Sequence, residues 1–185
     1  ARFALLSTIA VALVWAPVGG WFMWRDAGAY GSTQWSLLIA SGVLHVIYFV
    51  TLLRGYRLGD LSVVYPVARG TGPLLSAMAA TVVLDERLGA LGWAGVLGIV
   101  GGIALLAGLP FPGRSARGVP ASEIDRARLR AGIVYGLLTG ACIASYTVVD
   151  GYAVKRAGVS PVLVDYLGNL VRLPVTVLLI RVLGP

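Results

Sequence analysis

The sequence has 185 residues, of which 58% are hydrophobic and 12% charged, and its mean hydropathy is +0.86. Average soluble domains carry about 25% charged residues, so this composition excludes an ordinary soluble globular protein and indicates a membrane protein whose partner is the lipid bilayer. The formal net charge of +7 does not indicate nucleic-acid binding, because most Lys and Arg lie between apolar runs. At such positions they set the topology and contact lipid headgroups.

Six apolar runs have the roughly 20 residues that an α-helix needs to cross a bilayer. Short polar connectors separate them, except for the segment 110–130, which contains five arginines and is the only credible linker between subdomains. The sequence therefore predicts an all-α membrane protein with six transmembrane helices. They are expected at Phe3–Trp24, Trp35–Leu53, Leu61–Leu84, Leu88–Leu109, Ala131–Val149 and Pro161–Ile180.

The third run carries an arginine, Arg69, within a few residues of its centre. A lone charge at that depth costs roughly 2.5–3.5 kcal/mol on insertion scales, so a helix keeps it where it faces a protein-lined or water-filled cavity. Four neighbouring residues predict that the helix is irregular there, which lipid tolerates only where the backbone lines protein or a cavity. These residues are Pro66, Gly70, Gly72 and Pro73. Together they indicate a permeation or binding site.

Polar side chains recur at helical spacing on four of the six predicted helices. In lipid such a stripe must face other helices or water, so the four stripes can converge on one polar cavity. The alternative is hydrogen bonding between helices that only holds the bundle together. The stripes are Ser41, His45 and Tyr48; Tyr65, Arg69, Gly72 and Ser76; Tyr135, Thr139, Cys142, Tyr146 and Asp150; and Asp165, Asn169, Arg172 and Thr176.

Two of these stripes contain titratable groups whose roles stay open. His45 is either a proton acceptor near neutral pH or a hydrogen-bonded neutral histidine. Asp165 and Arg172 lie two helical turns apart on one face, so they form either a structural ion pair, with each other or with neighbours, or part of a binding site.

The fourth run has small residues at four-residue spacing, Ala94, Gly98 and Gly102. Such a ridge lets two helices approach closely. It packs either inside the bundle or against a second copy of the chain, which would form a homodimer.

The sequence shows no constellation that would make an enzyme. It lacks cysteine–histidine metal spacing and a glycine-rich phosphate loop, and His45 is its only histidine. We therefore expect no catalytic activity, no metal and no cofactor.

Several segments occur in an order that resembles a known family, the EamA-type half of the drug/metabolite transporter superfamily. The resemblance covers most of residues 1–109 and resumes weakly over 131–185. Its segments are Ser41-Gly-Val-Leu-His-Val-Ile-Tyr48, Tyr65-Pro66-Val-Ala-Arg69-Gly70-Thr-Gly-Pro73-Leu-Leu, Leu84-Asp-Glu86-Arg87-Leu88 and Gly92-Trp93-Ala-Gly95-Val-Leu-Gly98-Ile-Val-Gly101-Gly102.

The resemblance implies a ten-helix transporter built from two five-helix halves of inverted topology, a general plan for secondary transporters. Residues 1–109 would then be the first half without its first helix, and 131–185 the first two helices of the second half. The implied function is secondary transport of a small metabolite or drug-like solute across the cytoplasmic membrane, through a central polar cavity. A channel, or a structural membrane subunit without transport of its own, is the alternative.

The expected substrate-binding residues are Arg69, Tyr65, Tyr48, His45, Tyr146, Asp165 and Arg172. Arg69 would attract an anionic or polar group of the substrate or pair with Asp165 in one state of the cycle, and the tyrosines would line the cavity. The orientation stays open: Lys and Arg are more numerous on the side of the 110–130 linker, which the positive-inside rule places in the cytoplasm, whereas the family arrangement places that linker outside.

Overall fold

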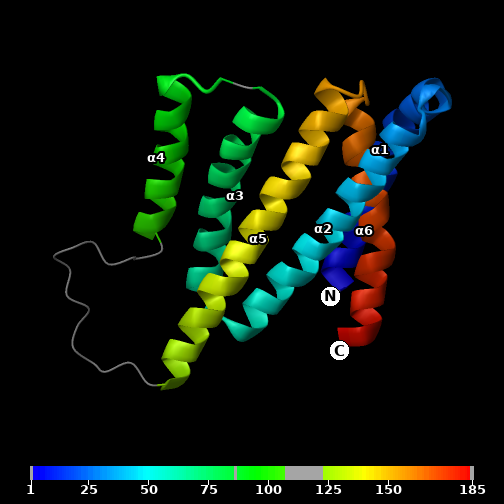
Figure 1. The fold of residues 1–185 in the computed structure, drawn as a ribbon. Coiled ribbons are helices and arrows are strands. Elements are labelled where there is room, and N and C mark those ends of the chain that lie inside the picture. The colour runs from blue at the N-terminus through cyan, green and yellow to red at the C-terminus, as the bar shows by residue number, and fades with distance from the viewer. Residues whose placement is uncertain (1, 86, 107–122, 184–185) are drawn as a thin grey trace. The chain divides into compact units, whose positions relative to one another are not determined.

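The computed structural model describes residues 2–85, 87–106 and 123–183, and within them all regular secondary structure is helical (Figure 1). The all-α prediction is therefore confirmed, with a helix at each of the six predicted positions. The elements in chain order are α1 (Arg2–Asp26), the short 3-10 helix η1 (Ala27–Ala29), α2 (Ser32–Leu58), α3 (Leu61–Val83), α4 (Ala90–Leu106), α5 (Glu123–Lys155) and α6 (Pro161–Leu183).

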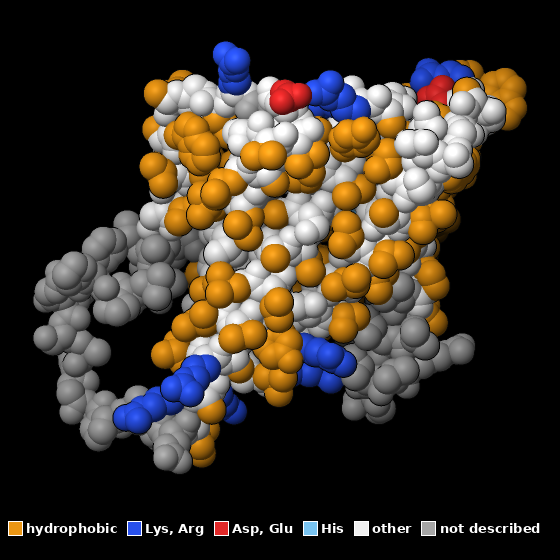
Figure 2. Space-filling model, in the orientation of Figure 1, with side chains coloured by type: hydrophobic (Ala, Val, Ile, Leu, Met, Phe, Trp, Pro, Cys, Tyr) orange, Lys and Arg blue, Asp and Glu red, His pale blue; other side chains and the backbone are white. Residues whose placement is uncertain are grey.

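Among the described residues, two helices are long and apolar enough to cross a membrane: α2 over its whole length and α5 over Arg126–Lys155. Shorter apolar stretches occupy Ala90–Gly102 and Pro161–Val171. On the face drawn in Figure 2, hydrophobic side chains cover the middle of the helices, and Lys and Arg lie near helix ends. This distribution is typical of a membrane protein, because hydrocarbon accepts the apolar side chains and headgroups accept the cations.

The chain forms two compact units, and α2 and α5 contribute to both. We name residues 1–46 with 146–185 the terminal unit, and residues 47–145 the central unit. This division does not follow chain order, so it differs from the predicted split at the 110–130 linker. Residues 107–122 lie outside the described part, whereas residues 123–130 form the first turns of α5.

In the central unit, a ridge of three glycines on α5 brings that helix close to α3. A Cβ at Gly136 would lie 2.7 Å from the Cβ of Val67, and one at Gly132 would lie 3.2 Å from the Cβ of Val63. Gly140 faces Thr71 in the same way. Glycines and their partners both recur every four residues, so they form matched ridges along the two helices. This glycine ridge was not identified from the sequence.

The predicted small-residue ridge on α4 is not a packing surface for the described part of the chain. Helix α4 lies beside α3 (Figure 1), but Ala94 and Gly98 are exposed, and a Cβ at Gly98 or Gly102 would meet open space. The half-buried side chains of α4 are Trp93, Val96 and Val100. Neither packing of the ridge inside the bundle nor contact with a second copy is shown for these residues, and both stay predictions.

The prolines and glycines predicted to make the third helix irregular do not interrupt it. Helix α3 is continuous from Leu61 to Val83, with Pro66 and Pro73 inside it. The hydroxyl of Thr71 donates to the carbonyl of Val67, four residues earlier on the same helix, at 2.7 Å. Gly70 and Gly72 are buried; a Cβ at Gly72 would lie 2.9 Å from Ile143 of α5. These glycines provide close packing and not an interruption of the helix.

Helix α3 begins with an aspartate cap. Asp60 accepts hydrogen bonds from the backbone N–H of Ser62 at 2.9 Å and from its hydroxyl at 2.7 Å. These bonds to the charged carboxylate lower the pKa of Asp60 below its ordinary value. The cap therefore determines that α3 begins directly after Asp60, next to the turn at Gly59.

The terminal unit has a small apolar core formed by Leu38, Ala153 and Val159. Two hydrogen bonds in the same unit join residues that are far apart in the sequence. The side chain of Gln34 donates to the carbonyl of Ala157 at 3.2 Å, and the backbone N–H of Ser160 donates to the Tyr30 hydroxyl at 2.9 Å. Gly158 makes the turn from α5 to α6 with a φ of +69°, which suits glycine. The start of α2 is thereby attached to the α5–α6 turn.

We expect Gly136→Ala to destabilise the central unit, because its methyl group would meet Val67 at 2.7 Å and force the helices apart. Overpacking of this kind costs about 1–3 kcal/mol. The matched control is Gly95→Ala on α4, where no atom lies within 4 Å of the added Cβ. Thermal melts of the purified protein should show a lower Tm for Gly136→Ala only. Equal melting of the two variants would contradict the close contact of α3 and α5.

The cap predicts a pH-dependent contribution to stability. Because folding lowers the pKa of Asp60, its charge stabilises the folded state above the ordinary aspartate pKa of about 3.9. This contribution is lost as the pH falls through the lowered value. Asp60→Asn keeps an acceptor but removes the charge, so its Tm should lie below wild type near neutral pH and converge with it on acidification. Circular dichroism melts over a pH series measure the difference in Tm between Asp60→Asn and wild type.

The control for that series is Gly95→Ala, which changes no charge and adds a Cβ where no atom lies within 4 Å. Its Tm should follow that of wild type over the whole pH range. A Tm difference between Asp60→Asn and wild type that stays constant down to strongly acidic pH would show that the charge of Asp60 contributes nothing to stability.

Candidate functional site

A pocket of about 370 Å³ lies in the terminal unit, with walls from α2, α5 and α6. Four titratable side chains line it, together with small or apolar residues that include Gly151 and Gly168. We name it the α2–α5–α6 pocket. Its titratable lining residues are His45, Asp150, Lys155 and Asp165. Two of them, His45 and Asp165, were predicted as binding residues.

His45 is held in one orientation by its own helix. Only 8% of the residue is exposed, and its Nδ1 lies 3.0 Å from the carbonyl oxygen of Ser41. A carbonyl oxygen only accepts hydrogen bonds, so we assign a proton to Nδ1. The ring of His45 is therefore hydrogen-bonded to its own helix, while its charge and the role of proton acceptor stay predictions.

The imidazole of His45 stacks on Tyr146 of α5. The ring centroids are 3.9 Å apart and the planes are inclined by 26°. Stacked rings of this kind contribute about 0.5–1.5 kcal/mol beyond the area they bury. Two of the four predicted polar stripes, those of the second and fifth helices, therefore meet at this pair.

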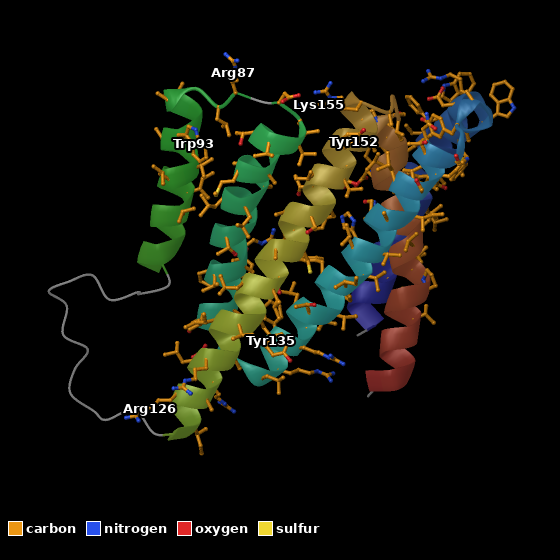
Figure 3. All side chains as sticks on the ribbon, viewed as in Figure 1. Arg87, Trp93, Arg126, Tyr135, Tyr152 and Lys155 are labelled. Atoms are coloured by element: carbon orange, nitrogen blue, oxygen red, sulfur yellow. The ribbon has the colours of Figure 1, made fainter. Side chains whose placement is uncertain are left out.

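The titratable groups lie at successive depths along the helices. Lys155 is the last residue of α5 and lies near the labelled Tyr152 at that end (Figure 3). At a rise of 1.5 Å per residue, Asp150 is about 7.5 Å further into α5, and Tyr146 is about 14 Å in. Asp165 is about 6 Å from the start of α6 at Pro161. Lys155 is thus nearest the end of α5, which we call the rim of the site. The carboxylates lie further from this end, and the histidine–tyrosine pair lies furthest from it.

Asp165 has a hydrogen-bond partner on its own helix. Its carboxylate accepts from the side-chain amide of Asn169 at 3.2 Å, and the residue is otherwise exposed to the pocket. The side chain of Arg172 lies outside what the structure describes, so the predicted pair of Asp165 with Arg172 stays a prediction. Arg69 belongs to the central unit and Asp165 to the terminal unit.

Arg69 is exposed, and so is its neighbour Tyr65, at 50%. The guanidinium carbon lies 5.5 Å from the centroid of the Tyr65 ring, within the range of a cation–π contact. The buried residues of α3 are on another part of its circumference, including Val64 and Ala68. Arg69 is about 100° around the helix from the buried Ala68. Arg69 is thus uncovered by the other helices of the central unit, and its role in binding stays a prediction.

The other predicted binding tyrosine of the central unit, Tyr48, is half-buried on α2. This end of α2 packs closely on its neighbours: a Cβ at Gly55 would lie 2.9 Å from Val64 and from Tyr135. Tyr135 is labelled on α5 in Figure 3. The predicted binding residues are thus divided between two units, with His45, Tyr146 and Asp165 in the terminal one.

A wider depression of about 620 Å³ lies where α1 and the α5–α6 turn meet, lined by Arg25, Asp26 and Tyr30 among others. The guanidinium of Arg25 pairs with Asp26 and lies 4.5 Å from the centroid of Phe22. The hydrogen bond from Arg25 lowers the pKa of the Asp26 carboxyl. Because the two charges cancel, this depression has no net charge to attract an ion.

Asp150 and Lys155 were not predicted as binding residues. Asp150 follows Tyr146 by one turn on the same polar stripe, so the helical spacing alone could have identified it. Lys155 resembles any cation at a helix end, and only the pocket identifies it. Among the described residues, no three His, Cys, Asp or Glu side chains are grouped to hold a metal ion.

Comparison of the sequence with protein-family models, with curated proteins and with solved structures finds no match. The function must therefore be argued from the helices and the pocket.

The exposure of Arg69 predicts how a cysteine at this position reacts. In a Cys142→Ser background, Arg69→Cys should be modified by a membrane-impermeant charged thiol reagent if position 69 faces water. Met78→Cys is the matched control, since Met78 is an apolar residue of the same helix and 50% exposed. Mass spectrometry of the reconstituted protein measures both reactions. Equal protection of the two cysteines would place Arg69 against lipid.

Proposed function

We propose that this protein is a secondary transporter of the EamA type, acting in the cytoplasmic membrane. It would move a small metabolite or drug-like solute, and the α2–α5–α6 pocket would be its binding site. The full transporter would have ten spanning helices in two inverted five-helix halves. The six helices of this chain would all be spans, belonging to the first half and the start of the second.

The observation that carries the proposal is a pocket lined by ionisable groups on helices of this apolarity. Its walls use α2 and α5, the two helices of the described part that are long and apolar enough to cross a membrane. Ionisable residues inside such helices are costly and usually mark solute or ion pathways. A pocket of this size also falls in the range of small-molecule sites, about 300–1,000 Å³.

The order of sequence motifs supports the choice of family. The Tyr65–Leu75 segment, the Glu86-Arg87-Leu88 step and the glycine-rich fourth helix occur in the order of an EamA-type half. Such halves surround a site near the membrane midplane in many transporters. The alternative functions, a channel or a structural subunit, predict no saturable solute binding in this pocket.

We expect Gly168→Leu to block transport without unfolding the protein. Gly168 is a buried pocket residue of α6, and no atom lies within 4 Å of an added Cβ there, so we expect the leucine side chain to extend into the pocket. Gly98→Leu on α4 is the matched control, because its added Cβ also meets open space but lies far along the chain from the pocket.

The measurement uses the full protein in liposomes loaded with a mixture of cell metabolites, with efflux followed by mass spectrometry. Wild type and Gly98→Leu should release the same saturable solute, and Gly168→Leu should not, while all three keep a similar Tm. Ion currents that exceed transporter turnover would identify a channel instead. Release of the solute by Gly168→Leu at the wild-type rate would overturn the assignment of the pocket.

A further inference from the structure

The α2–α5–α6 pocket has an uneven charge balance. Its lining contains two carboxylates, Asp150 and Asp165, against one ammonium, that of Lys155. Counted without His45, the lining carries one net negative charge. In a site bounded by apolar helices this charge interacts more strongly than in water, because the effective dielectric constant is lower.

The position of these charges favours a cation inside the pocket over an anion. Lys155 ends α5 at the rim, whereas Asp150 and Asp165 lie about one helical turn or more further in. A positively charged ligand that passes the rim would have a carboxylate on α5 and another on α6. An anion in the same place would face two like charges, which is unfavourable.

The imidazole ring of His45 forms one flat side of the pocket and is held in place. The ring is held by the Ser41 carbonyl and by stacking on Tyr146, so it loses little freedom when a ligand packs against it. Glycines at 151 and 168 leave room on the helix walls, and the total volume of about 370 Å³ admits a molecule of one ring and a short side chain.

We propose that the α2–α5–α6 pocket takes a small organic cation carrying an ammonium group, with Asp150 and Asp165 as its counter-charges. This inference rests on the proposed function, since it names the substrate class of the same pocket. It replaces the anionic substrate group expected at Arg69, which lies in the central unit.

Three probes of nearly equal shape test the charge preference: benzylammonium, benzyl alcohol and benzoate. Binding is measured by calorimetry and by the shift in Tm, using the full purified chain in a non-ionic detergent. We expect benzylammonium to bind roughly tenfold or more tightly than the other two, as an added hydrogen bond to a charged group implies. Equal affinity for all three, or tighter binding of benzoate, would overturn the proposal.

Variants then locate the counter-charges. Asp150→Asn and Asp165→Asn keep the side-chain shape but remove one charge each, so each should weaken benzylammonium binding roughly tenfold or more while leaving benzyl alcohol binding unchanged. The matched control, Asp85→Asn, removes a carboxylate at the end of α3 and should change neither. If Asp150→Asn does not fold, the exposed Asp165 still provides the test. Benzylammonium binding that survives both substitutions would overturn the proposal.

The two proposals fail differently. Selective benzylammonium binding without any solute release from liposomes would refute transport and keep the cation site. Saturable release that is lost in Gly168→Leu but favours neutral or anionic solutes would keep transport and refute the cation site.

Discussion

The close contact between α3 and the glycine ridge of α5 decides which side chains of the central unit are covered. Gly132, Gly136 and Gly140 present no side chains, so Val63, Val67 and Thr71 come almost against the α5 backbone. With this face of α3 buried against α5, the side chains on the other faces of α3 lie outside that contact. Small-residue ridges are the usual way for helices to gain van der Waals contact in lipid, where no hydrophobic force drives them together.

That contact explains both the continuity of α3 and the exposure of Arg69. Contact with α5 from Val63 to Thr71 holds α3 as one helix although Pro66 and Pro73 each lack a backbone N–H donor. Arg69 lies outside the covered face and rests against Tyr65. A ligand of Arg69 would therefore approach from the exposed side of α3.

The terminal unit combines a rigid part with a charged one. The hydrogen bonds of Gln34 and Tyr30 attach the start of α2 to the α5–α6 turn, and the His45–Tyr146 stack joins α2 to α5 deeper in the unit. Between these attachments lies the pocket with Asp150 and Asp165. A solute site benefits from this arrangement, because side chains that are already ordered lose less entropy on binding.

The sequence by itself determined the all-helical class, the position of each helix and the polar stripes of α2 and α5 that meet at His45 and Tyr146. These features depend on local composition and on the 3.6-residue period, both of which can be read along one chain.

Only the tertiary structure decided which small residues pack and which charges share a site. Ala94 and Gly98 look as suitable for close packing as Gly132 and Gly136, yet only the latter face another helix. Asp150, Lys155 and Asp165 come together because Gly158 reverses the chain between α5 and α6. Both outcomes depend on how one helix is rotated and placed against another. Residue spacing along a single helix carries no information about that rotation, because it is set by the surfaces of both partners.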